Sequence, residues 1–161
     1  MRTRNFVLGF ALSAFVLCYG CSEAETQTLD PITVGAASVS AQDAATPRFG
    51  TWINQGNPDN VMIYEPYGNG GMKITVGGWN YTTMFDGVFV AVEGQQNAET
   101  AVEVIDEFST RIINKRNGRV SQIIINTLSA AGSTINNEYI RMDADGKIIG
   151  VGHVVYERSA R

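Results

Sequence analysis

Turn-forming residue groups recur along most of this chain at the intervals that hairpins require, and they constrain its fold more than any other feature. The groups are Gly56-Asn-Pro58, Gly68-Asn-Gly-Gly71, Asp86-Gly87, Glu93-Gly94, Asn117-Gly118, Ala131-Gly132 and Asp145-Gly146. Asn-Gly and Asp-Gly accept the positive φ angles of type I′ turns, whose twist matches paired antiparallel strands. Residues 47–161 hold 14 of the 17 glycines. We therefore expect this part of the chain to fold as β-strands joined by tight turns.

Short segments rich in β-branched and aromatic residues lie between these turns. They predict ten strands, at 49–54, 60–66, 72–77, 79–85, 88–92, 99–106, 108–116, 119–129, 133–142 and 147–157. Sequential tight hairpins favour an up-and-down barrel over a Greek-key sandwich, because Greek keys need some long crossovers. The predicted fold class is therefore all-β, an antiparallel up-and-down (meander) barrel of about 8–10 strands.

The first twenty residues have the build of an export signal. A basic start with Arg2 and Arg4 precedes the apolar run 6–17, which is too short for a transmembrane helix of about 20 apolar residues. Gly20 followed by Cys21 resembles a bacterial lipoprotein signal, in which the cysteine becomes the lipidated first residue. The alternative is an ordinary cleaved signal with an incidental cysteine. We expect an exported protein, anchored at the outer membrane through Cys21, or otherwise secreted or periplasmic.

A flexible tether is predicted at 21–46, between the signal peptide at 1–20 and one barrel domain at 47–161. The tether segment is rich in Ala, Ser, Thr and acidic residues, and it contains no aromatic residue. Such a composition cannot bury enough apolar area to offset the entropy of ordering the chain. The alternative for this segment is a first strand around 32–34.

The balance of charges and cysteines limits the partners and the means of stabilisation. The chain has 12 Lys and Arg against 16 Asp and Glu, a formal net charge of −4, which argues against nucleic-acid binding. We expect contact with the membrane through the N-terminal lipid anchor. Cys18 would leave with the signal peptide, so the mature chain would have no intramolecular disulfide and its domain would depend on its core.

Several short motifs in the predicted barrel resemble one family. They are Phe49-Gly-Thr-Trp52, Tyr81-Thr-Thr-Met-Phe-Asp-Gly87, Asn114-Lys-Arg-Asn-Gly-Arg-Val120, Ser129 with Gly132, and Val155-Tyr-Glu157. Together they resemble the bacterial secreted lipocalin-like proteins, broadly of the calycin type, over nearly all of 48–158. The resemblance implies an antiparallel barrel, often with a small apolar ligand, and no shared catalytic residues. It also implies that Trp52 closes one end of the barrel.

Four residues are candidates for ligand contacts, because the lumen of such a barrel holds side chains or one small ligand. Trp79, Tyr81 and Phe85 share one face of their segment. They would contact a ligand if that face points inward, and core packing is the alternative. Arg141 could pair with a ligand carboxylate if it points inward, and it is an ordinary surface charge if it points outward. The expected ligand is a small, largely apolar molecule.

Candidates for chemistry are few. His153 is the only histidine and a weak candidate for a general base, since imidazole side chains titrate near neutral pH; a packed or surface role is the alternative. The residues suggest no metal site and no cofactor. The predicted function is binding or carriage of a small apolar ligand in the cell envelope. Two alternatives stay open: a cofactor-free isomerase, cyclase or hydratase, and a structural or partner-binding lipoprotein with a filled barrel.

Overall fold

The computed structural model describes residues 40–160. The predicted signal peptide at 1–20, the predicted lipid attachment site Cys21 and most of the predicted tether lie outside the described residues. No helix within the described part is long and apolar enough to cross a membrane.

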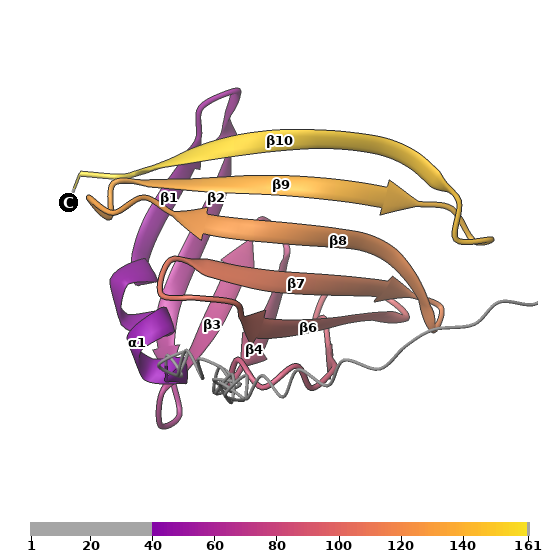
Figure 1. Ribbon diagram of the computed structural model, residues 1–161, viewed down its shortest axis with the longest axis horizontal. Helices are drawn as coiled ribbons and strands as arrows, with labels where there is room; N and C mark the ends of the chain where they lie inside the picture. The colour runs from indigo at the N-terminus through magenta and orange to yellow at the C-terminus, as the bar shows by residue number, and fades with distance from the viewer. Residues whose placement is uncertain (1–39, 161) are drawn as a thin grey trace, which may run out of the picture. The chain divides into compact units, whose positions relative to one another are not determined.

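Residues 40–160 contain one antiparallel sheet of ten strands (Figure 1). The strands are β1 Gly50–Asn54, β2 Asn57–Tyr67, β3 Gly71–Val76, β4 Trp79–Thr83, β5 Val90–Ala91, β6 Ala98–Val104, β7 Ser109–Arg116, β8 Arg119–Leu128, β9 Thr134–Met142 and β10 Ile148–Arg158. Their order in the sheet is β4-β3-β2-β1-β10-β9-β8-β7-β6-β5. Neighbours in sequence are therefore neighbours in the sheet, except at β4 and β5, and the pairing of β1 with β10 joins the two ends of the meander.

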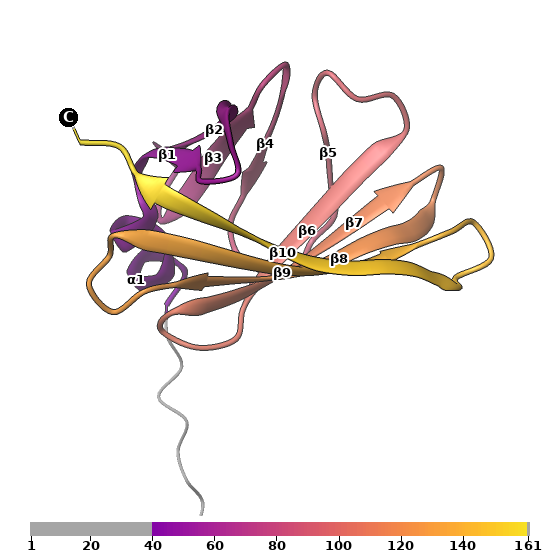
Figure 2. The same cartoon turned by 90° about the horizontal axis from the view of Figure 1, so that it is seen from above.

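The two edge strands, β4 and β5, face each other and nearly close the sheet into a barrel (Figure 2). An isolated bridge joins these edges through two backbone hydrogen bonds. Asn80 N donates to Glu93 O at 3.1 Å, and Glu93 N donates to Asn80 O at 2.8 Å. The prediction of an all-β, up-and-down antiparallel barrel is confirmed.

Each of the ten predicted strands overlaps one observed strand, and the largest differences lie around Phe85. The segment predicted at 79–85 leaves the sheet at Thr83, and the one predicted at 88–92 keeps only Val90–Ala91. Phe85 has a φ of 59°, which no strand accommodates. Its backbone N–H instead donates to Thr83 Oγ1 at 2.9 Å. A local turn therefore replaces the end of the predicted strand.

The last part of the predicted tether is helical and packs on the barrel. Helix α1 (Ala41–Ala45) continues into the 3-10 helix η1 (Thr46–Arg48). The Ser40 side chain accepts a hydrogen bond from the backbone N–H three residues later at 3.2 Å, which is an N-cap. The last two alanines of α1 are buried. The folded domain therefore begins before the predicted boundary at 47, because a capped alanine turn finds apolar surface to cover.

The core consists of side chains that point inward from alternate strand positions. Its buried members are Ala45, Trp52, Met62, Tyr64, Met72, Ile74, Tyr81, Phe85, Val92, Ala98, Val102, Ile112, Leu128, Ile135 and Tyr156. On β4, Tyr81 is buried opposite Ile74 of β3. This register turns the face of β4 that carries Trp79 and Tyr81 toward the inside of the barrel.

Candidate functional site

The inner face of the barrel lines a cavity of about 330 Å³. Ligand pockets begin at about this size, and liquid water would fill such a volume with about ten molecules, at roughly 30 Å³ each. Residues of β2, β3, β4, β6, β7, β8, β9 and β10 contribute to the lining. The cavity is therefore a feature of the whole barrel rather than of one loop.

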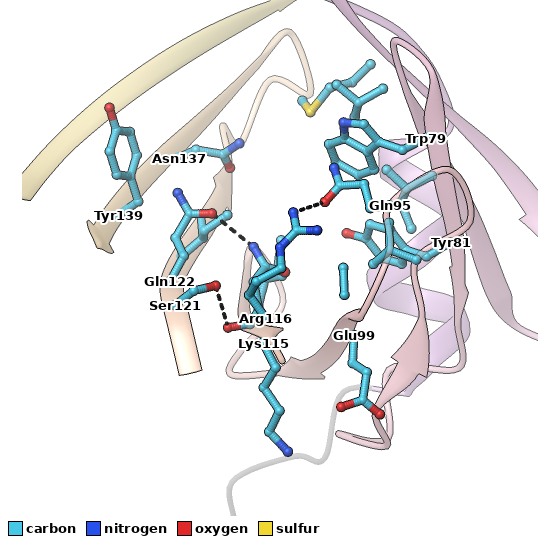
Figure 3. A pocket seen from close by; sticks show the side chains of 18 of the residues that line it. Trp79, Tyr81, Gln95, Glu99, Lys115, Arg116, Ser121, Gln122, Asn137 and Tyr139 are labelled. Carbon is cyan, nitrogen blue, oxygen red and sulfur yellow. Dashed lines mark hydrogen bonds between the residues drawn. The ribbon is translucent and has the colours of Figure 1, made fainter. Parts of the chain in front are cut away.

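Two aromatic side chains of β4 form one wall of the cavity. Trp79 and Tyr81 stack with ring centroids 6.1 Å apart and an interplanar angle of 9°. Tyr81 is only 7 % exposed, and Figure 3 shows its hydroxyl directed into the cavity. Burial, followed by the proximity of Tyr64, raises the pKa of Tyr81 well above its ordinary value of 10.0. The phenol therefore stays protonated and can donate a hydrogen bond at neutral pH.

Polar side chains of β6, β7 and β8 form the opposite wall. Thr100 Oγ1 donates to Asn114 Oδ1 at 2.8 Å, and Asn114 Nδ2 donates to Gln122 Oε1 at 3.0 Å. The Gln122 Nε2 group, like the Tyr81 hydroxyl, has no hydrogen-bond partner among residues 40–160. This wall therefore presents an unused donor to whatever occupies the cavity.

A buried arginine lies behind the inner end of the cavity. Arg48, the last residue of η1, is 1 % exposed. Its Nη1 and Nη2 groups donate to the carbonyls of Ala44 and Phe108, each at 2.6 Å, and its Nε donates to Asn126 Oδ1 at 3.3 Å. Asn126 Nδ2 then donates to Oδ1 of Asn137, a lining residue, at 2.8 Å. Burial lowers the pKa of Arg48, and Tyr64 and Asp106 partly offset this effect.

Trp52 lies at the same end of the barrel as Arg48 and is fully buried. Its indole Nε1 donates to Arg48 O at 2.8 Å, and the guanidinium carbon of Arg158 lies 4.2 Å from the centroid of its ring. Arg158 also donates to the carbonyls of Pro47 in η1 at 2.5 Å, Phe49 at 2.6 Å and Gly132 at 2.7 Å. Strands β1 and β10 are thus tied to η1 around the tryptophan predicted to close the barrel.

The other end of the cavity carries charged side chains. Arg116 donates to Gln95 Oε1 at 2.7 Å and to Gln96 O at 2.9 Å, and Figure 3 shows the bond to Gln95 beside the aromatic wall. Glu99 and Lys115 point away from the cavity in the same view. Lys115 Nζ instead lies 3.4 Å from the centroid of the Phe89 ring.

The structure brings together two of the four candidate ligand contacts. Trp79 and Tyr81 line the cavity, whereas Phe85 and Arg141 do not. Phe85 packs in the core cluster because the positive φ at that residue ends the strand. Arg141 is exposed near the end of β9, where its guanidinium carbon lies 5.8 Å from the Tyr139 ring centroid. Arg141 pairs with the lining residue Gln122 of β8, yet its own side chain is exposed and does not line the cavity.

His153, the weak candidate base, is exposed on the outer face of the barrel. It lies on β10 opposite Glu138 of β9, in a shallow apolar depression with Ile140 and Val151. It does not line the inner cavity. Across residues 40–160 no group of three or more His, Cys, Asp and Glu side chains is placed to hold a metal ion.

The sequence interpretation missed the polar residues of the inner cavity. Asn126, Asn137 and Gln122 stand at inward positions of β8 and β9, and Arg48 precedes the first strand. The available signal was an amide residue in an otherwise apolar segment, such as Asn126 after three isoleucines. Such a residue needs a partner when buried.

Comparison of the sequence with protein-family models finds no match, and comparison with curated proteins finds none either. The nearly closed antiparallel barrel is compatible with a lipocalin-like fold. Membership of the bacterial lipocalin-like proteins remains a prediction that rests on the short motifs.

Proposed function

We propose that this barrel reversibly binds a small, largely apolar molecule in its inner cavity, in the cell envelope. The cavity of about 330 Å³ and its aromatic wall support the binding part of the proposal. The envelope part rests on the leader predicted at 1–20. The resemblance to lipocalin-like proteins points in the same direction, since such barrels often hold an apolar ligand.

The unpaired donors of the lining carry this proposal. Buried polar groups are almost always hydrogen-bonded, and leaving one unpaired costs about 1–3 kcal/mol. The Tyr81 hydroxyl and Gln122 Nε2 face the cavity without a protein partner within residues 40–160, and both stay accessible from it, since Asn136 Oδ1 is the one fully buried side-chain atom of the described part that lacks a partner. Water or a ligand must therefore complete their bonds. A barrel that serves only as a filled scaffold would gain nothing from leaving them open.

Binding is better supported than catalysis by the lining residues. A general base must reach the reacting group with a lone pair available. Glu99 is the one carboxylate among the described lining residues, and it is exposed and points away from the cavity. Tyr81 is a phenol, protonated at neutral pH, and burial raises its pKa further. The cavity therefore offers donors that orient a ligand rather than a base that would attack one.

Titration with N-phenyl-1-naphthylamine, a neutral apolar dye whose emission rises in apolar surroundings, tests the proposal. The purified protein should bind it saturably at one site. Val154→Phe places a ring in the cavity, because Val154 lines it, whereas Val151→Phe adds the same group on the outer face, where Val151 is 73 % exposed. We expect the first variant to bind the dye at least tenfold more weakly, a loss of about 1.4 kcal/mol.

The second variant should bind the dye like the wild type. Circular dichroism checks that both variants keep the fold. An absence of saturable dye binding, or equal affinity in the two folded variants, would contradict the proposed function.

A further inference from the structure

Two successive hydrogen bonds link the side chains of Arg48, Asn126 and Asn137, and the donor-to-acceptor direction of both bonds is fixed. Arginine is a donor only, so the oxygen of the Asn126 amide must face the guanidinium at 3.3 Å. The amide nitrogen of Asn126 then faces Oδ1 of Asn137 at 2.8 Å. The remaining group of Asn137, its Nδ2, is thereby left as a donor.

Asn137 presents this donor to the cavity. The residue lines the cavity, and Figure 3 shows its amide group pointing from β9 into the open space. Its Nδ2 has no hydrogen-bond partner in the described part of the chain. Because successive hydrogen bonds polarise one another, the cation at the start of the chain strengthens the donor at its end.

The guanidinium behind this donor donates a hydrogen bond to no carboxylate within residues 40–160, although Asp106 lies near enough to raise its pKa. Three of its contacts are neutral acceptors, two backbone carbonyls and the Asn126 amide. The ion pair found between described residues, Arg111 with Glu103, lies elsewhere. A buried cation is costly unless it is paired. An anionic group at the inner end of the cavity would therefore be attracted both by the charge and by the donor.

We propose that Asn137 Nδ2 binds the carboxylate of a small apolar monocarboxylic acid. This inference rests on the proposed function and names its ligand class. The apolar body of the acid lies against the wall of Trp79 and Tyr81, which stack with ring centroids 6.1 Å apart. A carboxylate suits the site because it is acceptor-only, and the unpaired groups of Asn137, Tyr81 and Gln122 are all donors.

Displacement of N-phenyl-1-naphthylamine by three eight-carbon probes tests the ligand class. The probes are octanoate, octan-1-ol and 2-octanone, which share a chain and differ in the head group. We expect octanoate to displace the dye from the wild type at concentrations at least tenfold lower than either neutral probe. Equal potency of 2-octanone and octanoate would overturn the assignment to a carboxylate.

Two substitutions reverse the polarity at the cavity without removing the chain of contacts. Asn137→Asp keeps the acceptor for Asn126 Nδ2 and replaces the cavity-facing donor with a carboxylate oxygen. Asn126→Asp still accepts from Arg48, but it offers no donor to Asn137, whose amide must then turn its oxygen to the cavity. In each variant the preference for octanoate over octan-1-ol should fall at least tenfold.

Asn57→Asp is the matched control, because it makes the same change at an exposed residue, the first of β2, whose Oδ1 accepts a bond from Asp59 N at 3.3 Å. It should keep the wild-type preference. Dye binding that fails in the wild type would refute the proposed function itself. Normal dye binding with no preference for octanoate, or an unchanged preference in the folded variants, would overturn this inference alone. If neither variant folds, the three probes on the wild type still decide it.

Discussion

The two ends of the barrel interior differ in how their polar groups are satisfied. At the closed end, around Trp52 and Arg48, the indole N–H and the guanidinium donate to protein acceptors at 2.6–3.3 Å. At the cavity end, around Tyr81 and Gln122, donors face open space with no partner within residues 40–160. Both ends bury aromatic rings, so burial alone does not separate them.

The presence or absence of a protein hydrogen-bond partner distinguishes side chains that stabilise the fold from side chains that are available to bind a ligand. A paired buried group adds about 1 kcal/mol to stability, whereas an unpaired one subtracts its desolvation cost. The closed end therefore supplies stability, whereas the donors at the cavity end are accessible from the cavity and add no hydrogen bond within residues 40–160. Asn137 belongs to both ends, because its oxygen completes the closed-end network and its nitrogen opens on the cavity.

Truncating the two tryptophans should show the largest contrast between the ends. Trp52→Ala removes a fully buried ring, the hydrogen bond to Arg48 O and the contact with Arg158, and it should lower the free energy of unfolding by about 3–5 kcal/mol. Trp79→Ala removes a partly exposed ring from the cavity wall and should cost about 1 kcal/mol. Urea unfolding measures both values. Equal losses of unfolding free energy in Trp52→Ala and Trp79→Ala would contradict the proposed difference between the closed end and the cavity end.

Alkaline titration should reveal the buried phenols of the barrel interior. Burial raises the pKa of Tyr64 and of Tyr81 far above the ordinary value of 10.0. Below pH 10 both phenols are protonated in the folded and unfolded chains, so their contribution to stability does not change. Above pH 10 the unfolded chain loses these protons and the folded chain keeps them. Stability should then fall by about 1.4 kcal/mol per pH unit for each tyrosine, until the folded pKa is reached.

Urea unfolding at pH 8 to 11 measures this slope. Tyr64→Phe and Tyr81→Phe should each reduce the slope of the free energy of unfolding above pH 10 by about 1.4 kcal/mol per pH unit, the share of one tyrosine. Tyr67→Phe, at a 46 % exposed residue, should leave this slope unchanged. A wild-type stability that is the same at pH 8 and at pH 11 would contradict burial of the phenols.

The strand pattern and the meander order could be predicted because they depend on local signals. Turn pairs such as Asn117-Gly118 adopt the positive φ angles that tight hairpins require, and short hairpins leave little choice of topology. The helix at Ala41–Ala45 was not predicted, because one turn shows no sustained period and gains its stability from contact with the barrel. Phe85 was misplaced because its turn depends on a bond to the Thr83 side chain.

The candidate site could be predicted only in part. Trp79 and Tyr81 were identified because alternation places them on one face, and the register of β3 with β4 decides that this face points inward. Arg48, Asn126 and Asn137 come from three separate segments, and their contacts depend on tertiary structure that no spacing reveals. Arg141 shows the converse: it pairs with the lining residue Gln122 of β8, yet its exposed side chain lies by the Tyr139 ring and does not line the cavity.

The smallest expected effect concerns the bond between Arg116 and Gln95 at the charged end of the cavity. Because this bond is exposed, Gln95→Ala should change the free energy of unfolding by less than about 0.5 kcal/mol. Gln95 lines the cavity, so the loss of its side chain should speed release of N-phenyl-1-naphthylamine, which stopped-flow displacement by excess octanoate measures.

Gln55→Ala is the control, since Gln55 also makes an exposed side-chain bond, to Glu157 at 2.5 Å, but lies outside the cavity lining. We expect a few-fold faster release in the first variant and no change in the second. A stability loss of several kcal/mol in Gln95→Ala would mean that the cavity end holds the fold as the closed end does. Equal release rates in the two variants would mean that the bond between Arg116 and Gln95 does not slow the escape of the dye from the cavity.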